Sequence, residues 1–412
     1  MLQMDQDELT GVETPASDIT LEAPTSVAAI RRNADALLPV IVEEADAIEA
    51  GARLSPRAAS VMRAAGVFEL AFPASRGGVE GGLADQVELT AAIASVDASA
   101  GWNVGVLNAG GFYASRLGDE AYAELYPTRD RPTSGSFHPR GRAIVTDGGY
   151  LVTGQWGWGS GSYTADHVLG GAEVFEPDGT PVLDAAGKQL HLGLWLPKPS
   201  LVVADDWQTL GVRGSGSTSY SIVEPAFVPT GHAFDRDAED DPTAAPLNKS
   251  VKLAHYALTG VVLGVAQHLV SCTADFLKER GADATGRQAL GEAIGEVDFA
   301  YAGVMEVAKR TDDIIFTPGR GLQPMDTARM TAANAIAAGA LQRVLLQVIE
   351  IASARYILDA NPIQRVIRDA MSALAHAGTR KKHLVSLGSA ALTDDRRDYT
   401  IADGIAHDRA GI

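Results

Sequence analysis

The sequence predicts an α+β fold in which helices precede and follow a central β region, and three observations support it. From about residue 25 to residue 125, apolar residues recur at three- and four-residue spacing, the period of an amphipathic helix. Alternating, β-branched runs separated by Gly-Gly and Pro-Asp-Gly turns occupy about 133–229, a pattern typical of strands. Long amphipathic segments return from residue 249 onward. We therefore expect an N-terminal helical domain, a small central β domain and a C-terminal helical bundle.

The same pattern sets the expected boundaries. We expect a flexible tail at 1–24, the N-terminal helical domain at 25–132, the central β domain at 133–240 and the helical bundle at 241–412. The first residues are acidic and polar, which is not the composition of a signal peptide or membrane anchor. Ser55 and Pro56 are a plausible N-cap and first-turn residue of one helix. In the bundle we expect helices at 251–279, 287–316, 326–358 and about 362–391, four antiparallel helices with short connections.

Composition and charge restrict the classes of partner. The 412 residues are 46% hydrophobic and 21% charged, which is typical of a globular protein. A net charge of −18 opposes binding to nucleic acid or to an anionic membrane, so we expect a small-molecule ligand. The single cysteine, Cys272, cannot form an internal disulfide, and this favours the cytoplasm. No histidine and carboxylate spacing typical of a metal site occurs, so we expect no metal.

The segment GQWGWGSGSYTADH at 154–167 is the most unusual stretch of the β region. Its small residues would let the backbone approach a flat ligand closely. Trp158 offers an aromatic face or edge, and the hydroxyl of Ser160 offers a directional donor. The alternative is a packed β hairpin in which Trp156 and Trp158 are core aromatics and the serines are turn residues.

Six segments, in this order and spacing, resemble the acyl-CoA dehydrogenase fold superfamily. Within it they are similar to the flavin-dependent two-component monooxygenases, the branch with the hydroxyphenylacetate hydroxylase oxygenase components and the desulfurisation oxygenases. The segments are MRAAGVFELAFPASRGG (62–78), SVDASAGWN (95–103), SGSFHPRGRAIVTDGGYLVTGQWGWGSG (134–161), WQTLGVRGSGS (207–217), FVP (227–229) and RDAMSALAH (368–376). The resemblance covers nearly the whole chain after residue 25. It implies that the β domain is a small β-barrel and that the C-terminal domain is a four-helix bundle.

The resemblance also implies a cofactor, reduced FMN or FAD, with O₂ as co-substrate. It places Ser160 near flavin N5 and the C4a oxygen adduct. Arg287 would reach a flavin phosphate across a subunit interface, with simple solvent exposure as the alternative. The turn at 211–219 would pack close to the flavin, with a plain β-turn as the alternative. The flavin-contacting residues implied besides Ser160 are Ser134, Ser136, Phe137, Trp158, Ser217 and Arg287.

The segment RDAMSALAHAGT distinguishes oxygenases from dehydrogenases. Acyl-CoA dehydrogenases carry a glutamate base at the position of Ala377, and alanine cannot remove a proton. The other location of that base, in LAHYALTGVVLG, has no carboxylate either. His376 instead matches a histidine of the monooxygenases, where it would take a proton from a phenol or hold the terminal proton of a flavin hydroperoxide. The alternative for His376 is a helix histidine bonded to a neighbouring carbonyl.

Trp102, His138 and His255 are candidates for substrate binding. Packing between helices, a solvated loop position and a core position are the respective alternatives. The resemblance implies an oxygenase that receives reduced flavin by diffusion from a separate NAD(P)H:flavin reductase. It would form a C4a-hydroperoxide and hydroxylate a small aromatic substrate. N- or S-oxygenation on the same fold, desaturation of an acyl-CoA, and a flavin-fold binding protein without activity remain as alternatives.

Two features concern assembly and the C-terminus. The apolar segment TAANAIAAGALQRVLLQVIEIASA (331–354) has more aliphatic surface than a monomer is expected to expose, which predicts a homotetramer, or at least a dimer. The last stretch, TDDRRDYTIADGIAHDRAGI, differs from the usual closing helix of the branch.

Overall fold

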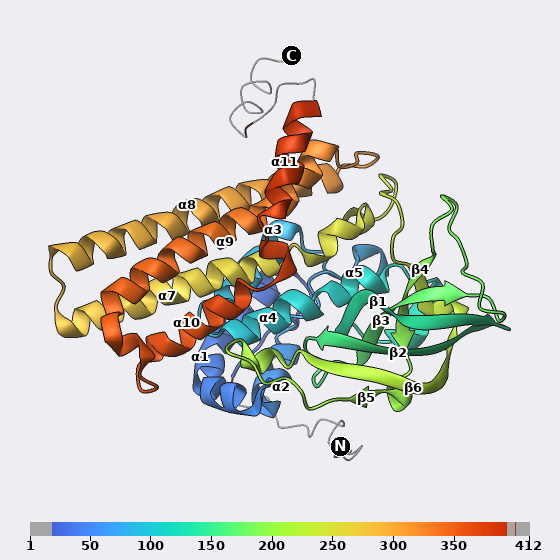
Figure 1. Ribbon diagram of the computed structural model, residues 1–412, viewed down its shortest axis with the longest axis horizontal. Coiled ribbons are helices and arrows are strands. Elements are labelled where there is room, and N and C mark those ends of the chain that lie inside the picture. The colour runs from blue at the N-terminus through green and yellow to red at the C-terminus, as the bar shows by residue number, and fades with distance from the viewer. Residues whose placement is uncertain (1–18, 394–399, 401–412) are drawn as a thin grey trace.

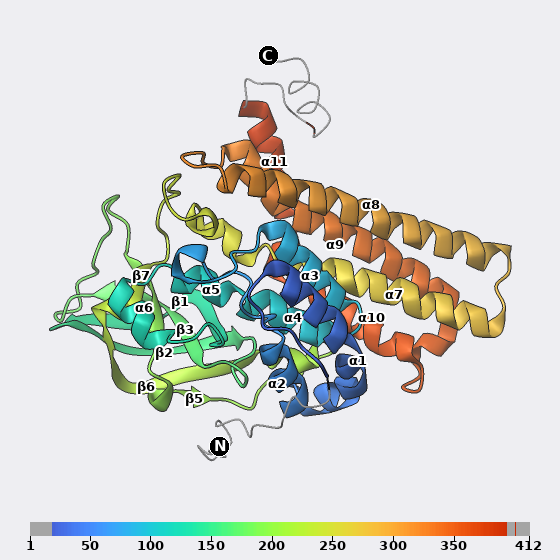
Figure 2. The same cartoon turned by 180° about the vertical axis from the view of Figure 1, so that it is seen from behind.

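The computed structural model describes residues 19–393 and residue 400 and shows a mixed α+β fold (Figure 1). The seven-stranded sheet lies at one end of the molecule and the long helices α7 (Leu258–Arg280), α8 (Ala284–Ile315) and α9 (Pro324–Ala352) at the other. Helices of the N-terminal third lie between them in both views (Figures 1 and 2). The predicted order of helices, strands and helices is confirmed. The expected tail at 1–24 falls mainly outside the described residues.

The N-terminal third forms six α-helices within the described chain. They are α1 (Val27–Gly51), α2 (Pro56–Ala64), α3 (Leu83–Ala94), α4 (Ala98–Leu107), α5 (Ala109–Ala114) and α6 (Asp119–Leu125). The predicted cap of α2 is confirmed, because Ser55 Oγ accepts a hydrogen bond from the backbone N–H of Ala58 and Pro56 opens the helix. Asp97 caps α4 in the same way. This cap fixes the start of the helix that carries Trp102.

The sheet holds all seven described strands in the order β5-β6-β2-β1-β3-β4-β7. Only β1 and β3 pair in parallel, and the other pairs are antiparallel. Trp156 and Tyr220 stack inside the sheet, with ring centroids 5.5 Å apart, and both are almost fully buried. The bounds are β1 (Thr133–Thr146), β2 (Gly149–Gly159), β3 (His167–Phe175), β4 (His191–Leu196), β5 (Val202–Val203), β6 (Thr218–Pro229) and β7 (Ala233–Asp235).

The C-terminal helices differ from the prediction at two places. Residues 251–255 form a 3₁₀ turn, so α7 begins at Leu258 and not at 251. The continuous helix expected over 362–391 is wrong, because α10 (Pro362–Ala373) ends early and α11 (Lys382–Thr393) is a separate helix that projects from the body (Figure 1). His376 causes this break, since its backbone is extended (φ −62°, ψ 146°) and its ring accepts a hydrogen bond from Gly378 N–H.

Two stretches, Val251–Arg280 and Pro324–Ile357, are long and apolar enough to cross a membrane by length and composition. In this fold 67% and 50% of their most apolar windows are buried. Core helices of globular proteins pass the same test, and α7 here contacts α3, α9 and α10. Their apolar residues thus belong to the largest hydrophobic core of the chain.

Candidate functional site

Ser160 is the meeting point of three segments that are distant in sequence. Trp102 Nε1 of α4 donates to Ser160 Oγ at 3.0 Å. The hydroxyls of Ser160 and Ser217 lie 2.6 Å apart, and those of Ser217 and Ser215 lie 2.8 Å apart. Ser134 Oγ of β1 donates to the backbone oxygen of Ser160 at 2.7 Å. The structure therefore brings four predicted site residues together and adds Ser215, which the prediction missed. We call Ser215, Ser217 and Ser160 the serine relay.

The glycines of the 154–167 segment are required by close packing around Ser160. A Cβ atom at Gly159 would lie 2.6 Å from Ser162 Oγ, and one at Gly161 would lie 2.8 Å from Leu107. Gly161 also has φ +75°, a left-handed conformation that side chains disfavour. The chain turns sharply out of β2 at this point, and this turn sets the position of Ser160.

The two tryptophans of the segment have different roles. Trp156 is fully buried, so the packed-hairpin interpretation is correct for it. Trp158 is 74% exposed and has φ +66°, which is uncommon for any residue other than glycine. Its ring meets Trp207 edge to face, with centroids 5.6 Å apart. An exposed indole on a strained backbone is not a core aromatic, so that interpretation fails for Trp158.

Either atom of each hydroxyl pair can be the donor, so we infer the direction of the serine relay from where an unpaired proton would be left. An indole can only donate, so Trp102 occupies one acceptor position of Ser160 Oγ. If Ser160 donated to Ser217 and Ser217 to Ser215, the proton of Ser215 would have no acceptor among the described residues, although Ser215 is only 1% exposed. The opposite direction pairs the protons of both Ser215 and Ser217. It leaves one proton, that of Ser160, directed at an acceptor outside the relay.

His376 lies beside Trp102, with ring centroids 5.4 Å apart in an edge-to-face contact. The sequence placed His376 on a helix, but it follows the end of α10 and caps the 3₁₀ turn Ala377–Thr379. Its Nδ1 accepts from Gly378 N–H at 3.2 Å, so we infer that the neutral ring carries its proton on Nε2. Burial, with smaller contributions from the charges of His255 and His383, lowers the pKa of His376 to about 4. At neutral pH the ring is an uncharged donor through Nε2.

A cluster of four rings, Tyr113, Phe137, Phe234 and His255, lies next to this region, and we call it the aromatic cluster. Tyr113 is central, with ring centroids 4.2 Å from Phe137 and 5.6 Å from Phe234, and its hydroxyl lies 3.1 Å from His255 Nε2. His255 lies on the 3₁₀ turn before α7, not on a helix as expected. Burial lowers the pKa of His255, yet the side chain keeps an exposed face. Both properties are expected for a residue in the wall of a recess.

The remaining predicted residues lie apart from Ser160. Phe137 belongs to the aromatic cluster, and the backbone N–H of Ser136 donates to Tyr220 Oη at 2.8 Å. His138 is exposed in an irregular part of β1 where the strand register shifts. Arg287 opens α8, at the end of the long helices that is away from the sheet (Figure 1). One chain alone therefore does not bring Arg287 to Ser160.

Ser215 and Tyr113 were not predicted as site residues, and the sequence pattern indicates only the first of them. Ser215 alternates with Ser217 in RGSGS, a spacing that puts both on one face of an extended turn. Tyr113 lies in a glycine-rich helical stretch without a motif, so only the structure reveals its contact with His255. Within residues 19–393, no group of three or more His, Cys, Asp or Glu residues could hold a metal.

A surface groove of about 680 Å³ between α11 and the start of α9 is separate from this region. Its lining includes His383, Lys252 and Asp240 and none of the predicted site residues. Because the paired hydroxyls, the exposed indole and the two neutral histidines all lie elsewhere, we place the candidate site at Ser160.

Comparison with known proteins shows which proteins this chain resembles. The family described as acyl-CoA dehydrogenase, C-terminal domain, matches residues 256–381. The chain is 28% identical, over 366 residues, to the oxygenase subunit HsaA of a flavin-dependent monooxygenase from Mycobacterium tuberculosis, covering 83% of this chain and 90% of that protein. It is 27% identical to an indole-3-acetate monooxygenase from Acinetobacter baumannii, covering 76% and 80% of the two chains.

Solved structures have the same fold. The crystal structure of HsaA from M. tuberculosis has a TM-score of 0.81 at 25% identity and covers 89% of this chain and 97% of its own. XiaF from Streptomyces sp., solved in complex with FADH₂ and glycerol, has a TM-score of 0.82 at 23% identity and covers 90% and 96%. The chain thus has the acyl-CoA dehydrogenase fold. Within that superfamily, it is similar over most of its length to oxygenase components of flavin-dependent monooxygenases.

Proposed function

We propose that this chain is the oxygenase component of a two-component flavin-dependent monooxygenase. It uses reduced flavin and O₂ to hydroxylate a small aromatic substrate. The single observation that carries the proposal is the serine relay, because the direction inferred for it leaves the proton of Ser160 for a ligand at a strand end beside the exposed Trp158. The similarity to flavin-dependent monooxygenases over 83% of the chain supports it.

The residues around Ser160 fit a flavin. Trp158 offers an exposed aromatic surface, and its small neighbours allow close approach of a flat ring. Trp207 Nε1 and Arg213 Nε are buried polar atoms without a partner among the described residues, so they are available as donors to a ligand. Bound reduced FMN or FAD would supply the electrons that activate O₂. We propose that the bound flavin is bordered by four serines, Ser134, Ser136, Ser160 and Ser217, and by the neighbouring Trp158 and Phe137. We also propose that Arg287 of another subunit reaches the flavin phosphate.

Each residue near the flavin then has a distinct role in the proposed reaction. Ser160 donates a hydrogen bond to the bound flavin, and Trp102 holds Ser160 Oγ in place. His376 holds a proton at Nε2 and donates it as a hydrogen bond to the oxygen being transferred or to the substrate. Packing around the site excludes water from the reaction. Ala377, where dehydrogenases carry their base, disfavours desaturation.

We propose that the aromatic cluster and Trp102 bind the substrate, with His138 at the more exposed edge. Stacking and edge contacts with Tyr113 and Phe137 suit a flat aromatic ring. His255, bonded to Tyr113, offers a polar contact for a hydroxyl or ring nitrogen of the substrate. A relative named indole-3-acetate monooxygenase is consistent with an aromatic substrate. N- or S-oxygenation would use the same arrangement.

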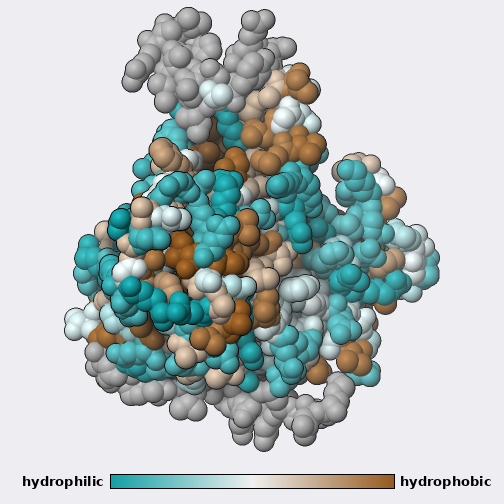
Figure 3. Space-filling view, turned by 60° about the vertical axis from the view of Figure 1, so that its left-hand side comes forward, coloured by the Kyte–Doolittle hydropathy of each residue, from teal (hydrophilic) through white to brown (hydrophobic). Residues whose placement is uncertain are grey.

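We further propose the assembly and partners of the enzyme. Reduced flavin arrives by diffusion from a separate NAD(P)H:flavin reductase in the cytoplasm, without nucleic acid or membrane. The proposed domains are a helical domain at 25–132, a small β-barrel at 133–240 and a four-helix bundle within 241–412. Apolar side chains gather on the face seen in Figure 3, and α8 and α9 expose Phe299 (83%) and Leu346 (63%). This surface supports a homotetramer, and light scattering at the mass of one 43.1 kDa chain would contradict it.

Reaction of the protein with reduced flavin tests the proposed activity. The protein is titrated anaerobically with reduced and oxidised FMN and FAD, then mixed with O₂ in a stopped-flow spectrometer. We expect tighter binding of a reduced flavin and much slower return of its oxidised spectrum than in free solution. Reoxidation at the rate of free flavin contradicts the proposal. Reduction of bound flavin by an acyl-CoA would indicate a dehydrogenase. Failure to bind either reduced or oxidised flavin would indicate a protein without oxygenase activity.

A further inference from the structure

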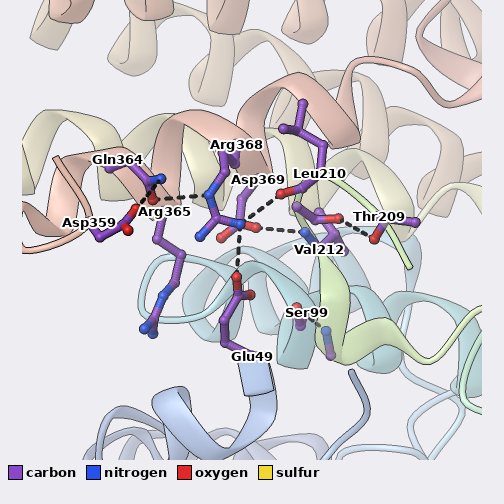
Figure 4. A network of polar contacts seen from close by, with 12 residues as sticks. Glu49, Ser99, Thr209, Leu210, Val212, Asp359, Gln364, Arg365, Arg368 and Asp369 are labelled. Carbon is purple, nitrogen blue, oxygen red and sulfur yellow. Dashed lines mark hydrogen bonds and ion pairs between the residues drawn. The ribbon is translucent and has the colours of Figure 1, made fainter. Parts of the chain in front are cut away.

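A network of ionic and polar contacts joins α10 to the loop that carries the serine relay (Figure 4). We call residues 210–217 the anchored loop. Asp369 Oδ1 accepts from the backbone N–H of Val212 at 2.6 Å, and Arg368 Nη1 donates to the backbone oxygen of Leu210 at 2.7 Å. Arg368 also forms an ion pair of 2.8 Å with Glu49 of α1. Two adjacent residues of one helix thus bind two backbone positions of the loop.

The backbone of the anchored loop shows that this contact holds it in a strained form. Val212 has φ +52°, a conformation that is costly for a β-branched residue. A Cβ at Gly211 would lie 2.3 Å from the carbonyl of Arg368, so the loop packs on the backbone of α10 directly. Strain of this kind persists only where the surroundings fix it. The hydrogen bond from Val212 to Asp369 is such a fixing contact.

The other side of the anchored loop is bound to α4, the helix that carries Trp102. Ser99 Oγ accepts from Gly214 N–H at 3.0 Å, and Asn103 Nδ2 donates to the Gly214 oxygen at 3.1 Å. The loop then bonds to the segment of Ser160, because Gly161 N–H donates to the Ser215 oxygen at 2.9 Å. A continuous set of contacts therefore leads from α10 through the loop to Ser160.

Packing alone does not explain a carboxylate at position 369. The side chain of Asp369 is buried, and burial, with Asp97 and Glu49 nearby, raises its pKa to about 7. A buried carboxylate of this kind destabilises the fold near neutral pH unless its contacts compensate. The only hydrogen bond described for it is the one from Val212.

We propose that Asp369 and Arg368 are positioning residues that hold the anchored loop and thereby aim the proton of Ser160 at the bound ligand. They act through Ser215 and Ser217 and touch neither flavin nor substrate. The inference rests on the proposed function for its catalytic consequence. Its structural part, coupling between position 369 and the segment 158–164, can be measured without any ligand.

Hydrogen–deuterium exchange of the full-length protein tests that coupling. Asp369→Ala removes the acceptor of Val212 N–H, and Asp369→Asn keeps an acceptor oxygen. Asp312→Ala is the matched control, because Asp312 of α8 also accepts from two backbone N–H groups, those of Leu83 and Ala84. We expect Asp369→Ala to speed exchange in peptides covering 210–217 and 158–164. Asp369→Asn should restore most of the protection in these peptides. Asp312→Ala should speed exchange only at the start of α3.

Peroxide release measures the consequence for the reaction. With reduced flavin and O₂, we expect Asp369→Ala to release H₂O₂ about 3- to 10-fold faster than the wild type, with flavin affinity nearly unchanged. Unchanged exchange at 158–164 in Asp369→Ala, or an equal effect there in Asp312→Ala, overturns the inference. If Asp369→Ala does not fold, Ser99→Ala loosens the same loop from α4, and unchanged exchange at 158–164 in that variant is equally decisive. A wild type that binds no reduced flavin contradicts the proposed function instead, and the exchange result remains interpretable.

Discussion

The serine relay, which bonds to Trp102, and the aromatic cluster differ in the chemistry that they offer a ligand. In the direction that we infer for the relay, the protons of Ser215 and Ser217 have acceptors and Ser160 is left as a donor to a ligand. Around the aromatic cluster, burial lowers the pKa of both His255 and His376 and keeps these rings neutral. The first region provides directed polarity and the second provides an uncharged aromatic surface. An enzyme that must hold a reactive oxygen species away from water needs both.

Removing the donor of the relay is expected to have the largest effect. Ser160→Ala deletes a hydrogen bond worth about 1–3 kcal/mol, so H₂O₂ release should become roughly 10- to 100-fold faster while flavin still binds. Stopped-flow absorbance with a peroxide assay measures both quantities. Ser162→Ala is the control, because Ser162 is also buried but bonds only to Gly159. Equal peroxide release in the two variants would contradict the role of Ser160.

Changing His376 tests the other region. His376→Ala should leave flavin reoxidation slow but lower product formation by at least about 10-fold, with peroxide replacing product. Because Nδ1 is bonded to Gly378, we expect a donor role, so His376→Gln, whose amide also donates, should recover part of the product yield. The measurement is the ratio of product to peroxide at each pH. A glutamine variant as inactive as alanine would favour proton removal from the substrate.

The turn that follows Ser160 should be sensitive to a single methyl group. Gly161→Ala places a Cβ 2.8 Å from Leu107 at φ +75°, and should lower the free energy of unfolding by about 1–3 kcal/mol. Gly157→Ala is the control, since its Cβ would meet only Ser219 Oγ, at 3.7 Å. Urea denaturation compares the variants. Equal stability of the two would show that the tight turn is not required.

The pH dependence of stability tests the buried carboxylate that holds the anchored loop. Burial raises the pKa of Asp369, the hydrogen bond from Val212 and the charge of Arg368 oppose this, Asp97 and Glu49 add to it, and the net result is a pKa of about 7. The folded chain therefore holds a proton that the unfolded chain releases, and the contribution of this group to stability falls as pH rises from about 4 to 7. Asp369→Asn lacks this titration, so relative to the wild type it should gain about 1–3 kcal/mol between pH 5 and pH 8. Parallel stability curves would contradict the raised pKa.

The sequence predicted the parts of this site that depend on local chemistry. Caps such as Ser55 and the change from helical to strand periodicity are local signals, and the structure confirms them. The helix predicted through residue 391 is interrupted at His376, whose extended backbone and local hydrogen bond with Gly378 N–H are not indicated by the apolar spacing. Likewise, no spacing could distinguish the buried Trp156 from the exposed Trp158, since this difference in exposure depends on a left-handed backbone at Trp158. Contacts such as Tyr113 with His255 join residues 142 positions apart and need the fold.

The most direct test of the central claim is a double-mutant cycle on the serine relay. Peroxide release is measured for the wild type, Ser160→Ala, Ser217→Ala and the double variant. If Ser217 acts only by directing the proton of Ser160, the double variant should release peroxide at the same rate as Ser160→Ala alone. Effects that multiply in the double variant would mean that Ser217 acts independently of Ser160, and would contradict the relay.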